Sequence, residues 1–274
     1  MKIHKKNRKG MVLILTFIIL TTLTAIIVGF MYLASTQLKG SGYDAASQKA
    51  LWLAEAGIEK ALWYLKTPVA NGGYGENWIT DANGITENFG GGTYTIVVTS
   101  WNFALAANGA VASDSPVQTN EYTPDKAIDN ESSTFWESKG YPGGGNNKLL
   151  IIKFPYPLSL YKVGFTPVPL WNNPTEYYWF ISIDGKAWSA WIQTGQTSDV
   201  LTPKVNWLRL DIRQVATPGK TVRIATVTVT GRKIRSTGTV NGISRTVERV
   251  VVAKEWAPMQ TGYGFFAPNW NETD

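Results

Sequence analysis

The first 66 residues show three successive patterns of polar and apolar positions. Residues 1–10 carry five basic side chains and no acidic one, and residues 11–38 carry no charged side chain. A helix rises about 1.5 Å per residue, so about 20 apolar residues cross the hydrocarbon core of a membrane. Residues 11–38 are therefore expected to form a membrane-spanning helix. Because the basic residues lie on its N-terminal flank, the N-terminus is expected to stay in the cytoplasm.

The third pattern, in residues 43–66, predicts that this helix continues as an amphipathic one. Apolar residues recur there at helical spacing and form a single stripe. The stripe consists of Leu51, Ala54, Ile58, Ala61, Leu62 and Leu65. A secretory signal peptide describes the segment less well, because its apolar core is only about 7–15 residues long and its cleavage site follows that core. A plain membrane anchor without processing is the alternative.

A basic leader that ends in Gly10 and runs directly into a hydrophobic helix resembles the type IV pilin class. The string LAEAGIEKA, residues 53–61, is similar to the PilX-like minor pilins. This resemblance implies that a prepilin peptidase cuts between Gly10 and Met11 and methylates the new terminus at Met11. It also implies other pilin or pseudopilin subunits as partners, and passage from the bacterial inner membrane to a cell-surface pilus.

The chain departs from the major pilins at the fifth position of the mature protein. Major pilins carry Glu there, whereas this chain has Leu15. A carboxylate inside the apolar core of a filament is costly unless it is paired. Leu15 therefore removes a docking contact, which favours a minor or tip position over bulk polymerisation.

Two later segments predict the strands of a small antiparallel sheet. Residues 92–102 form one strand with Tyr94, Ile96 and Val98 on one face, after a Gly- and Asn-rich stretch, residues 67–92, that predicts a loop. A β-hairpin is expected around Asn241-Gly242, which suits a two-residue type I′ turn. PilX-like proteins place two such strands close together in sequence, whereas residues 103–231 separate them here. A domain inserted into a surface loop is the simplest interpretation.

The expected insert contains short β-rich runs bounded by Gly, Pro and Asn, which predicts a β-sandwich. It also resembles the coagulation factor five/eight type C, or discoidin, domain. The matching positions are Ala127, Asp129, Thr134 and Trp136, then Ser182, Asp184, Gly185 and Trp188, then Trp207–Leu210 and Val227–Gly231. The resemblance implies an all-β jelly-roll sandwich of the galactose-binding-like kind that binds glycans or lipids.

The expected fold class is therefore α+β. A long N-terminal transmembrane or pilin helix packs on a small antiparallel sheet, into which the sandwich is inserted. The expected divisions are a leader (1–10), the helix (11–66), a loop and first strand (67–102), the sandwich (103–231), and the returning strands with a C-terminal tail (232–274).

The discoidin resemblance implies a structural calcium ion in the loop that follows Ala127. Asp129 and Thr134 would be ligands there, while Thr226 stands where the family has a closing Glu. Ca²⁺ takes six to eight oxygen ligands. The alternative is that Asp129 only fixes the turn through its own hydrogen bonds.

Exposed aromatic residues on loops of the insert are candidates for stacking on a sugar. Tyr141, Trp171 and Tyr178 are the ligand-binding candidates, with packing against the protein as the alternative. Other tryptophans, Trp136, Trp188 and Trp207, are expected in the core. Lys139, Lys148 and Arg213 are candidates for contacting anionic groups, with a solvated surface as the alternative.

Composition narrows the range of functions. The net charge is +6, but five positive charges lie in the leader. The excess of positive charge therefore reflects the orientation of the chain in the membrane and not nucleic-acid binding. The chain has no Cys, and its single His is His4, inside the leader. Catalysis by Ser-His-Asp or Cys-His groups and most zinc sites are thereby excluded from the mature chain. We expect no enzymatic activity.

The expected function is that of a minor pilin or pseudopilin-like filament component that displays a discoidin-like domain for adhesion to glycans or surfaces. Two alternatives stay open. One is an inner-membrane-anchored carbohydrate-binding protein that never enters a filament, and the other is a type II secretion pseudopilin.

Overall fold

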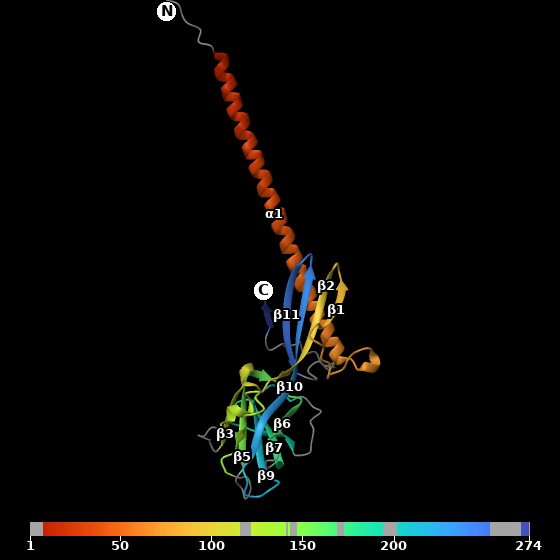
Figure 1. Cartoon of the computed structure of the whole chain (residues 1–274), viewed down its shortest axis with the longest axis vertical. Helices are drawn as coiled ribbons and strands as arrows, with labels where there is room; N and C mark the ends of the chain where they lie inside the picture. The colour runs from red at the N-terminus through yellow and green to blue at the C-terminus, as the bar shows by residue number, and fades with distance from the viewer. Residues whose placement is uncertain are drawn as a thin grey trace, which may run out of the picture.

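A computed structural model describes residues 8–115, 122–140, 142, 147–168, 173–193, 202–252 and 270–273, and the side chains of all these except residues 8–11 and 270–273. Helix α1 spans Arg8–Lys66, so the predicted processing residues Gly10 and Met11 lie in its first turn. Residues 12–45 of α1 are exposed throughout, and this half of the helix projects away from the rest of the molecule (Figure 1). Within the described residues, α1 is the one helix that is long and apolar enough to cross a membrane.

The strands form two antiparallel sheets. Their bounds are β1 Ile85–Phe89, β2 Gly92–Asn102, β3 Val111–Ser115, β4 Trp136–Glu137, β5 Lys148–Leu158, β6 Val163–Pro167, β7 Pro174–Ser182, β8 Ser189–Gln193, β9 Val205–Val215, β10 Arg223–Val240, β11 Ile243–Val252 and β12 Trp270–Thr273, with short 3₁₀ helices η1 Val69–Asn71, η2 Ala106–Asn108 and η3 Pro124–Ala127. One sheet has the order β1-β2-β10-β11-β12, with β4 and β6 also paired to β10, and the other has the order β3-β5-β9-β7-β8. The predicted α+β class is confirmed.

The sheet beside α1 contains the strands expected from the sequence. Strand β2 has the predicted bounds and buries Tyr94, Ile96 and Val98. It pairs with β10 although residues 103–231 separate the two predicted strands in sequence. The hairpin turn is also confirmed, because Asn241 and Gly242 both have positive φ, at 51° and 82°.

The loop prediction for residues 67–92 is wrong at its C-terminal end. Ile85–Phe89 form strand β1, which pairs with β2 from Ile85 opposite Ile96 to Phe89 opposite Gly92. This edge strand is short, mostly polar and fully buried at none of its positions. It therefore lacks the alternation of apolar residues by which strands are recognised in a sequence.

The C-terminal half of α1 lies on the sheet at a distance that only very small residues permit. A Cβ added to Gly57 would lie 2.1 Å from Ser236 Oγ, and one added to Gly238 would lie 2.0 Å from the backbone oxygen of Ala50. The predicted stripe is buried from Ala54 to Leu65, but Leu51 is only half-buried. Ala50 and Leu53 take its place, so the docked face is rotated slightly from the predicted one.

Polar contacts fix the helix on both sides of this small-residue contact. The Glu87 carboxylate accepts hydrogen bonds from the hydroxyls of Tyr94, at 2.5 Å, and Tyr64, at 3.0 Å. The bond from Tyr94 is the main reason why the pKa of Glu87 lies below its usual range. On another strand, Arg249 Nη1 of β11 lies 2.9 Å from Glu59 Oε1 of the helix.

The five-stranded sheet packs against β4, β6 and the first half of β10 to form a sandwich. The sandwich core contains Leu150, Ile152 and Phe154 of β5, Leu208, Leu210 and Ile212 of β9, and Val227 and Val229 of β10. Trp136 of β4 is also buried there, and its Nε1 donates to Asp114 Oδ2 at 3.0 Å. These two facing sheets agree with the sandwich expected from the sequence.

Strand β10 belongs to both parts of the molecule. Its first half pairs with β4 and β6, and its second half pairs with β2 and β11. Val227 and Val229 are buried in the sandwich, whereas Ile234 and Ser236 are buried beneath α1. Since successive residues of a strand point to opposite faces, the two halves of β10 bury opposite faces. The proposed boundary between residues 231 and 232 therefore falls within an unbroken strand.

The chain enters the sandwich at Asn102, whose side chain joins β2 to β10. Its Nδ2 donates to the Val227 oxygen at 2.9 Å, and its Oδ1 accepts from the Val229 nitrogen at 2.7 Å. The next residue, Phe103, packs over Gly231, where an added Cβ would lie 2.4 Å from the Phe103 ring.

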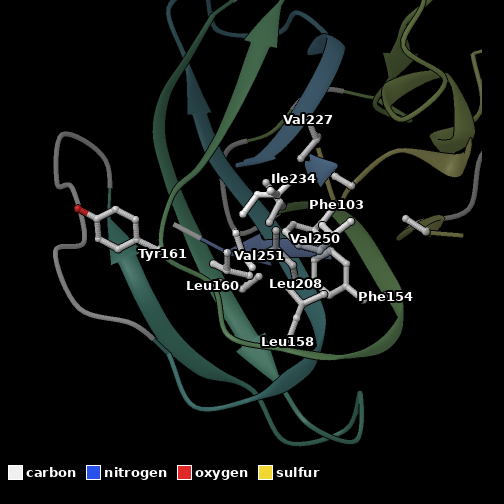
Figure 2. Close-up of a cluster of buried hydrophobic side chains, with 14 of the residues drawn as sticks. Phe103, Phe154, Leu158, Leu160, Tyr161, Leu208, Val227, Ile234, Val250 and Val251 are labelled. Atoms are coloured by element: carbon white, nitrogen blue, oxygen red, sulfur yellow. The ribbon is translucent and has the colours of Figure 1, made fainter. Parts of the chain in front are cut away.

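The same region carries apolar side chains from both parts of the molecule. Figure 2 shows Phe103, Val227 and Leu208 near Ile234, Val250 and Val251. The apolar core is therefore continuous across the junction.

The helix contact predicts a strong effect of a single methyl group. Gly238→Ala should destabilise the protein by about 1–3 kcal/mol, because the new Cβ meets the backbone of α1 and cannot be accommodated by a side-chain rotation. Chemical denaturation of the full chain in detergent micelles, followed by near-ultraviolet circular dichroism, measures this change. Gly40→Ala is the matched control, since nothing lies within 4 Å of a Cβ at that helical position. Equal stability of the two variants would contradict the packing described.

Candidate functional site

The loop predicted to bind calcium is held together by hydrogen bonds of Asp129. Its Oδ1 accepts from the Glu131 nitrogen at 2.9 Å, and its Oδ2 accepts from Thr134 Oγ1 at 2.7 Å. Asn130, between these partners, has a φ of 67°. These bonds are those of a residue that fixes a turn, which was the alternative interpretation of Asp129.

The other predicted calcium ligands do not add a second carboxylate to this loop. Ala127 is buried at the end of η3, and Thr226 lies on β10 opposite Thr166 of β6. Within the described residues, no group of three or more Asp, Glu, His or Cys side chains could hold a metal ion. The side chains supply one carboxylate and one hydroxyl, so backbone carbonyls, which the prediction includes, would have to supply most of the six to eight oxygens that Ca²⁺ takes. Calcium at Ala127, Asp129 and Thr134 stays a prediction.

Of the three aromatic ligand candidates, Tyr141 and Trp171 lie outside the described residues, and Tyr178 lies on strand β7 and not on a loop as expected. Its neighbour Trp179 is buried in the sandwich core, so Tyr178 faces the outer side of the five-stranded sheet. Strand β9 runs beside it with Leu208, Leu210 and Ile212 in the core. The alternate residues Arg209, Asp211 and Arg213 therefore share the outer face with Tyr178.

Three cations on this face lie over aromatic rings. The Arg213 guanidinium carbon lies 4.0 Å from the centre of the Tyr178 ring. The Arg209 guanidinium carbon lies 4.3 Å from the Phe180 ring and 4.6 Å from the Trp188 ring. On the same face, Lys153 Nζ lies 5.3 Å from the ring of Trp207. We call these three cations and their four rings the outer cation–aromatic row.

The row corrects two predictions about the core. Trp136 is buried as expected, but Trp188 and Trp207 are only half-buried. Both are expected in the core because they fall at positions that the discoidin family buries. The cations over their rings show instead that they belong to the outer face of the sheet.

A tight turn brings Trp188 back to β7. Asp184 Oδ1 accepts from the backbone nitrogens of Lys186, at 2.8 Å, and Ala187, at 3.0 Å, and these bonds lower the pKa of Asp184. Gly185 has a φ of 76°, and a Cβ there would lie 2.9 Å from the Trp207 ring. The Ser-x-Asp-Gly pattern thus places Trp188 and leaves room for Trp207.

A carboxylate lies beneath the row. Asp211 is only 4% exposed, and its Oδ2 accepts from Asn147 Nδ2 at 3.4 Å, whereas its buried Oδ1 has no hydrogen-bond partner among the described residues. Burial raises the pKa of Asp211, although the nearby charges of Arg213 and Arg209 oppose this effect. At the edge of the row, Glu176 Oε1 accepts from the Tyr178 hydroxyl at 3.4 Å.

The structure separates the three charged candidates named from the sequence. Arg213 is part of the row, Lys139 is exposed on a loop, and Lys148 is buried. Arg209 was missed, although the alternation in WLRLDIR, residues 207–213, puts it on the same face as Arg213. The pattern of residues along one strand does not reveal the register of β9 against β7. This register sets Phe180 opposite Arg209 and Tyr178 opposite Asp211.

No protein-family model matches the sequence, and no curated protein matches it. Solved structures resemble part of it. One is chitosan-binding module 1 of a chitosanase/glucanase from Paenibacillus sp. IK-5, with 15% identity and a TM-score of 0.38, covering 47% of this chain and 98% of the module. Another is the family 32 carbohydrate-binding module of C. perfringens NanJ, solved in complex with galactose, with 15% identity and a TM-score of 0.37, covering 48% of this chain and 99% of the module. The sandwich assignment rests on the strand pairing described above.

The Asp129 loop can be tested by removing the carboxylate. Asp129→Ala should lower stability by about 1–2 kcal/mol in the presence of EDTA, because two hydrogen bonds of the turn are lost. Repeating the denaturation with millimolar CaCl₂ tests the calcium prediction. A bound ion would stabilise the wild type and leave Asp129→Ala unchanged, whereas equal curves with and without calcium would contradict the predicted site. Lys139→Ala, on an exposed loop of the same part, is the control.

Proposed function

We propose that this chain is a minor pilin or pseudopilin-like filament component whose sandwich binds glycans outside the cytoplasm. The observation that carries the proposal is the shared strand β10. It joins a sheet that holds a long helix with an exposed apolar half to a sandwich whose outer face carries aromatic and cationic side chains. The helix is thus suited to insertion in an apolar environment, and the sandwich is suited to display of a binding face outside it.

The helix supports the first half of the proposal. An apolar helix that is exposed along residues 12–38 needs either lipid or other apolar helices around it. A pilin-like protein uses both in turn, first as an inner-membrane precursor and then in a filament on the cell surface. The leader that ends at Gly10 and the resemblance of residues 53–61 to PilX-like pilins favour this route over a permanent anchor.

Leu15 supports a minor or tip position. Its side chain is 58% exposed on α1, so a neighbouring subunit would meet an alkyl group there. The partners proposed on this basis are other pilin or pseudopilin subunits and the prepilin peptidase. An anchored carbohydrate-binding protein and a type II secretion pseudopilin remain the alternatives.

The sandwich supports the second half of the proposal. Half-buried aromatic rings and polar side chains on a rigid sheet are suited to non-covalent recognition of sugars. A calcium ion at Asp129, if bound, would have a structural role only. The proposed activity is adhesion and involves no covalent step.

The pilin assignment predicts a specific N-terminus. In filaments sheared from the native cell, mass spectrometry should find the protein beginning at a methylated Met11. Gly10→Val should block this processing and keep the protein in the membrane fraction, because the peptidase needs the small residue before the cut. Gly29→Val, at a position of α1 with no neighbour within 4 Å, is the control and should be processed normally. An intact leader confined to the membrane fraction of wild-type cells would favour the anchored alternative.

The adhesion assignment predicts retention of the full chain, in detergent micelles, on at least one immobilised polysaccharide. The panel should contain neutral polymers, such as dextran and galactan, and acidic ones, such as polygalacturonate. Binding should be reversible and competed by the soluble form of the same polymer. Failure on the whole panel would contradict glycan binding and leave the pilin assignment untouched.

A further inference from the structure

We propose that the outer cation–aromatic row binds the carboxylate groups of an acidic polysaccharide through Arg209 and Arg213. This inference rests on the proposed glycan-binding function and specifies its ligand class. The row lies on the outer face of the sheet β3-β5-β9-β7-β8, away from the Asp129 loop.

The first argument is that both guanidinium groups have unused donors. Within the described part of the chain, neither Arg209 nor Arg213 forms a hydrogen bond or an ion pair, and their contacts are with aromatic rings. Among the described residues, the Nε atom of each is buried without a hydrogen-bond partner, whereas each side chain as a whole is only half-buried. The terminal N–H groups therefore reach solvent, held in place by the rings beneath them.

The second argument is that the rings are already covered. A neutral sugar is usually held by stacking its C–H face on an open aromatic ring, but Arg213 lies 4.0 Å over Tyr178, and Arg209 lies against Phe180 and Trp188. The group that this face of the sheet presents to a ligand is the planar edge of each guanidinium. Such an edge matches a carboxylate, which accepts two parallel hydrogen bonds from it. Tyr178 thus acts in this proposal as a positioning residue for Arg213.

The third argument is the spacing of the cations. Arg209 and Arg213 are four residues apart on β9, which corresponds to about 13 Å along a strand. A single small anion cannot reach both groups. Lys153 of β5 lies over the ring of Trp207, and Trp207 precedes Arg209 by two residues on β9. Lys153 therefore extends the row further. A row of separated cations along one strand suits a polymer with repeated carboxylates.

Two acidic groups face the row and limit its charge. Asp211 lies between the two arginines and Glu176 lies at the edge beside Tyr178. Three cations against two carboxylates leave a modest positive balance. Duplex nucleic acid carries one charge about every 1.7 Å and is bound through many phosphate contacts. The sparser charge of a uronate polysaccharide is therefore the better match.

The test measures binding of the full chain in detergent micelles to polygalacturonate, neutral galactan and duplex DNA by biolayer interferometry. Arg209→Gln and Arg213→Gln should each weaken binding to polygalacturonate about tenfold, because each removes a charge-assisted hydrogen-bonding pair. Raising the salt concentration should weaken wild-type binding further. Lys162→Gln removes one exposed positive charge from the loop before β6, which lies in the other sheet, and should change affinity less than twofold.

Each outcome has one meaning. Unchanged polygalacturonate binding in the double variant Arg209→Gln/Arg213→Gln would overturn the assigned site, while binding itself would still support the proposed function. No binding to any polysaccharide, neutral or acidic, would contradict the glycan-binding half of the proposed function. DNA binding that matches polygalacturonate and depends on the same arginines would overturn the choice of a polysaccharide.

A second pair of variants distinguishes loss of the carboxylate contact from loss of the folded structure. Arg209→Lys and Arg213→Lys keep the positive charge and the apolar stem but remove the planar fork. They should retain the wild-type unfolding midpoint and still lose several-fold in affinity for polygalacturonate. Full affinity in both lysine variants would show that charge alone is recognised, and would overturn the bidentate carboxylate contact.

Discussion

The close contact between α1 and β10 is the constraint on which the rest of the structure depends. Gly57 and Gly238 let a helix backbone approach a strand to a distance at which one added methyl group would collide with Ser236 or Ala50. A contact with so little side chain between the backbones leaves no room for the helix to slide or rotate. It fixes which face of the helix docks and, through β10, where everything attached to that strand must lie.

Strand β10 transmits this constraint to the sandwich. Its halves bury opposite faces, one against the other sheet of the sandwich and one against the helix, so neither half can twist without disturbing the other core. Asn102 and Phe103 close the same junction from the entering side of the chain. The sandwich is therefore connected by two strands and a shared apolar core, and not by flexible linkers.

Much of the fold could be predicted from local patterns. The strand at 92–102, the Asn241-Gly242 turn and most of the helix stripe follow from periodicity and turn chemistry, which act within a few residues. Strand β1 could not be predicted, because an edge strand with a polar sequence is stabilised by its neighbour and not by its own pattern. The offset from Leu51 to Ala50 and Leu53 follows from the glycine contact, which joins residues far apart in sequence.

The candidate site was less predictable than the fold. Tyr178 and Arg213 were both named from the sequence, but for separate reasons. Their contact, and the place of Trp188 against Arg209, depend on strand register and on the turn at Asp184. The continuity of β10 has a mechanical consequence. A pull on the sandwich along the axis of β10 draws β2 and β10 together, because both strands continue into the sandwich. It loads their hydrogen bonds to the flanking strands β1 and β11 in parallel, as shear, so these bonds must break together. Such a geometry resists force far better than one whose bonds open singly, as is needed where a surface contact must hold under flow.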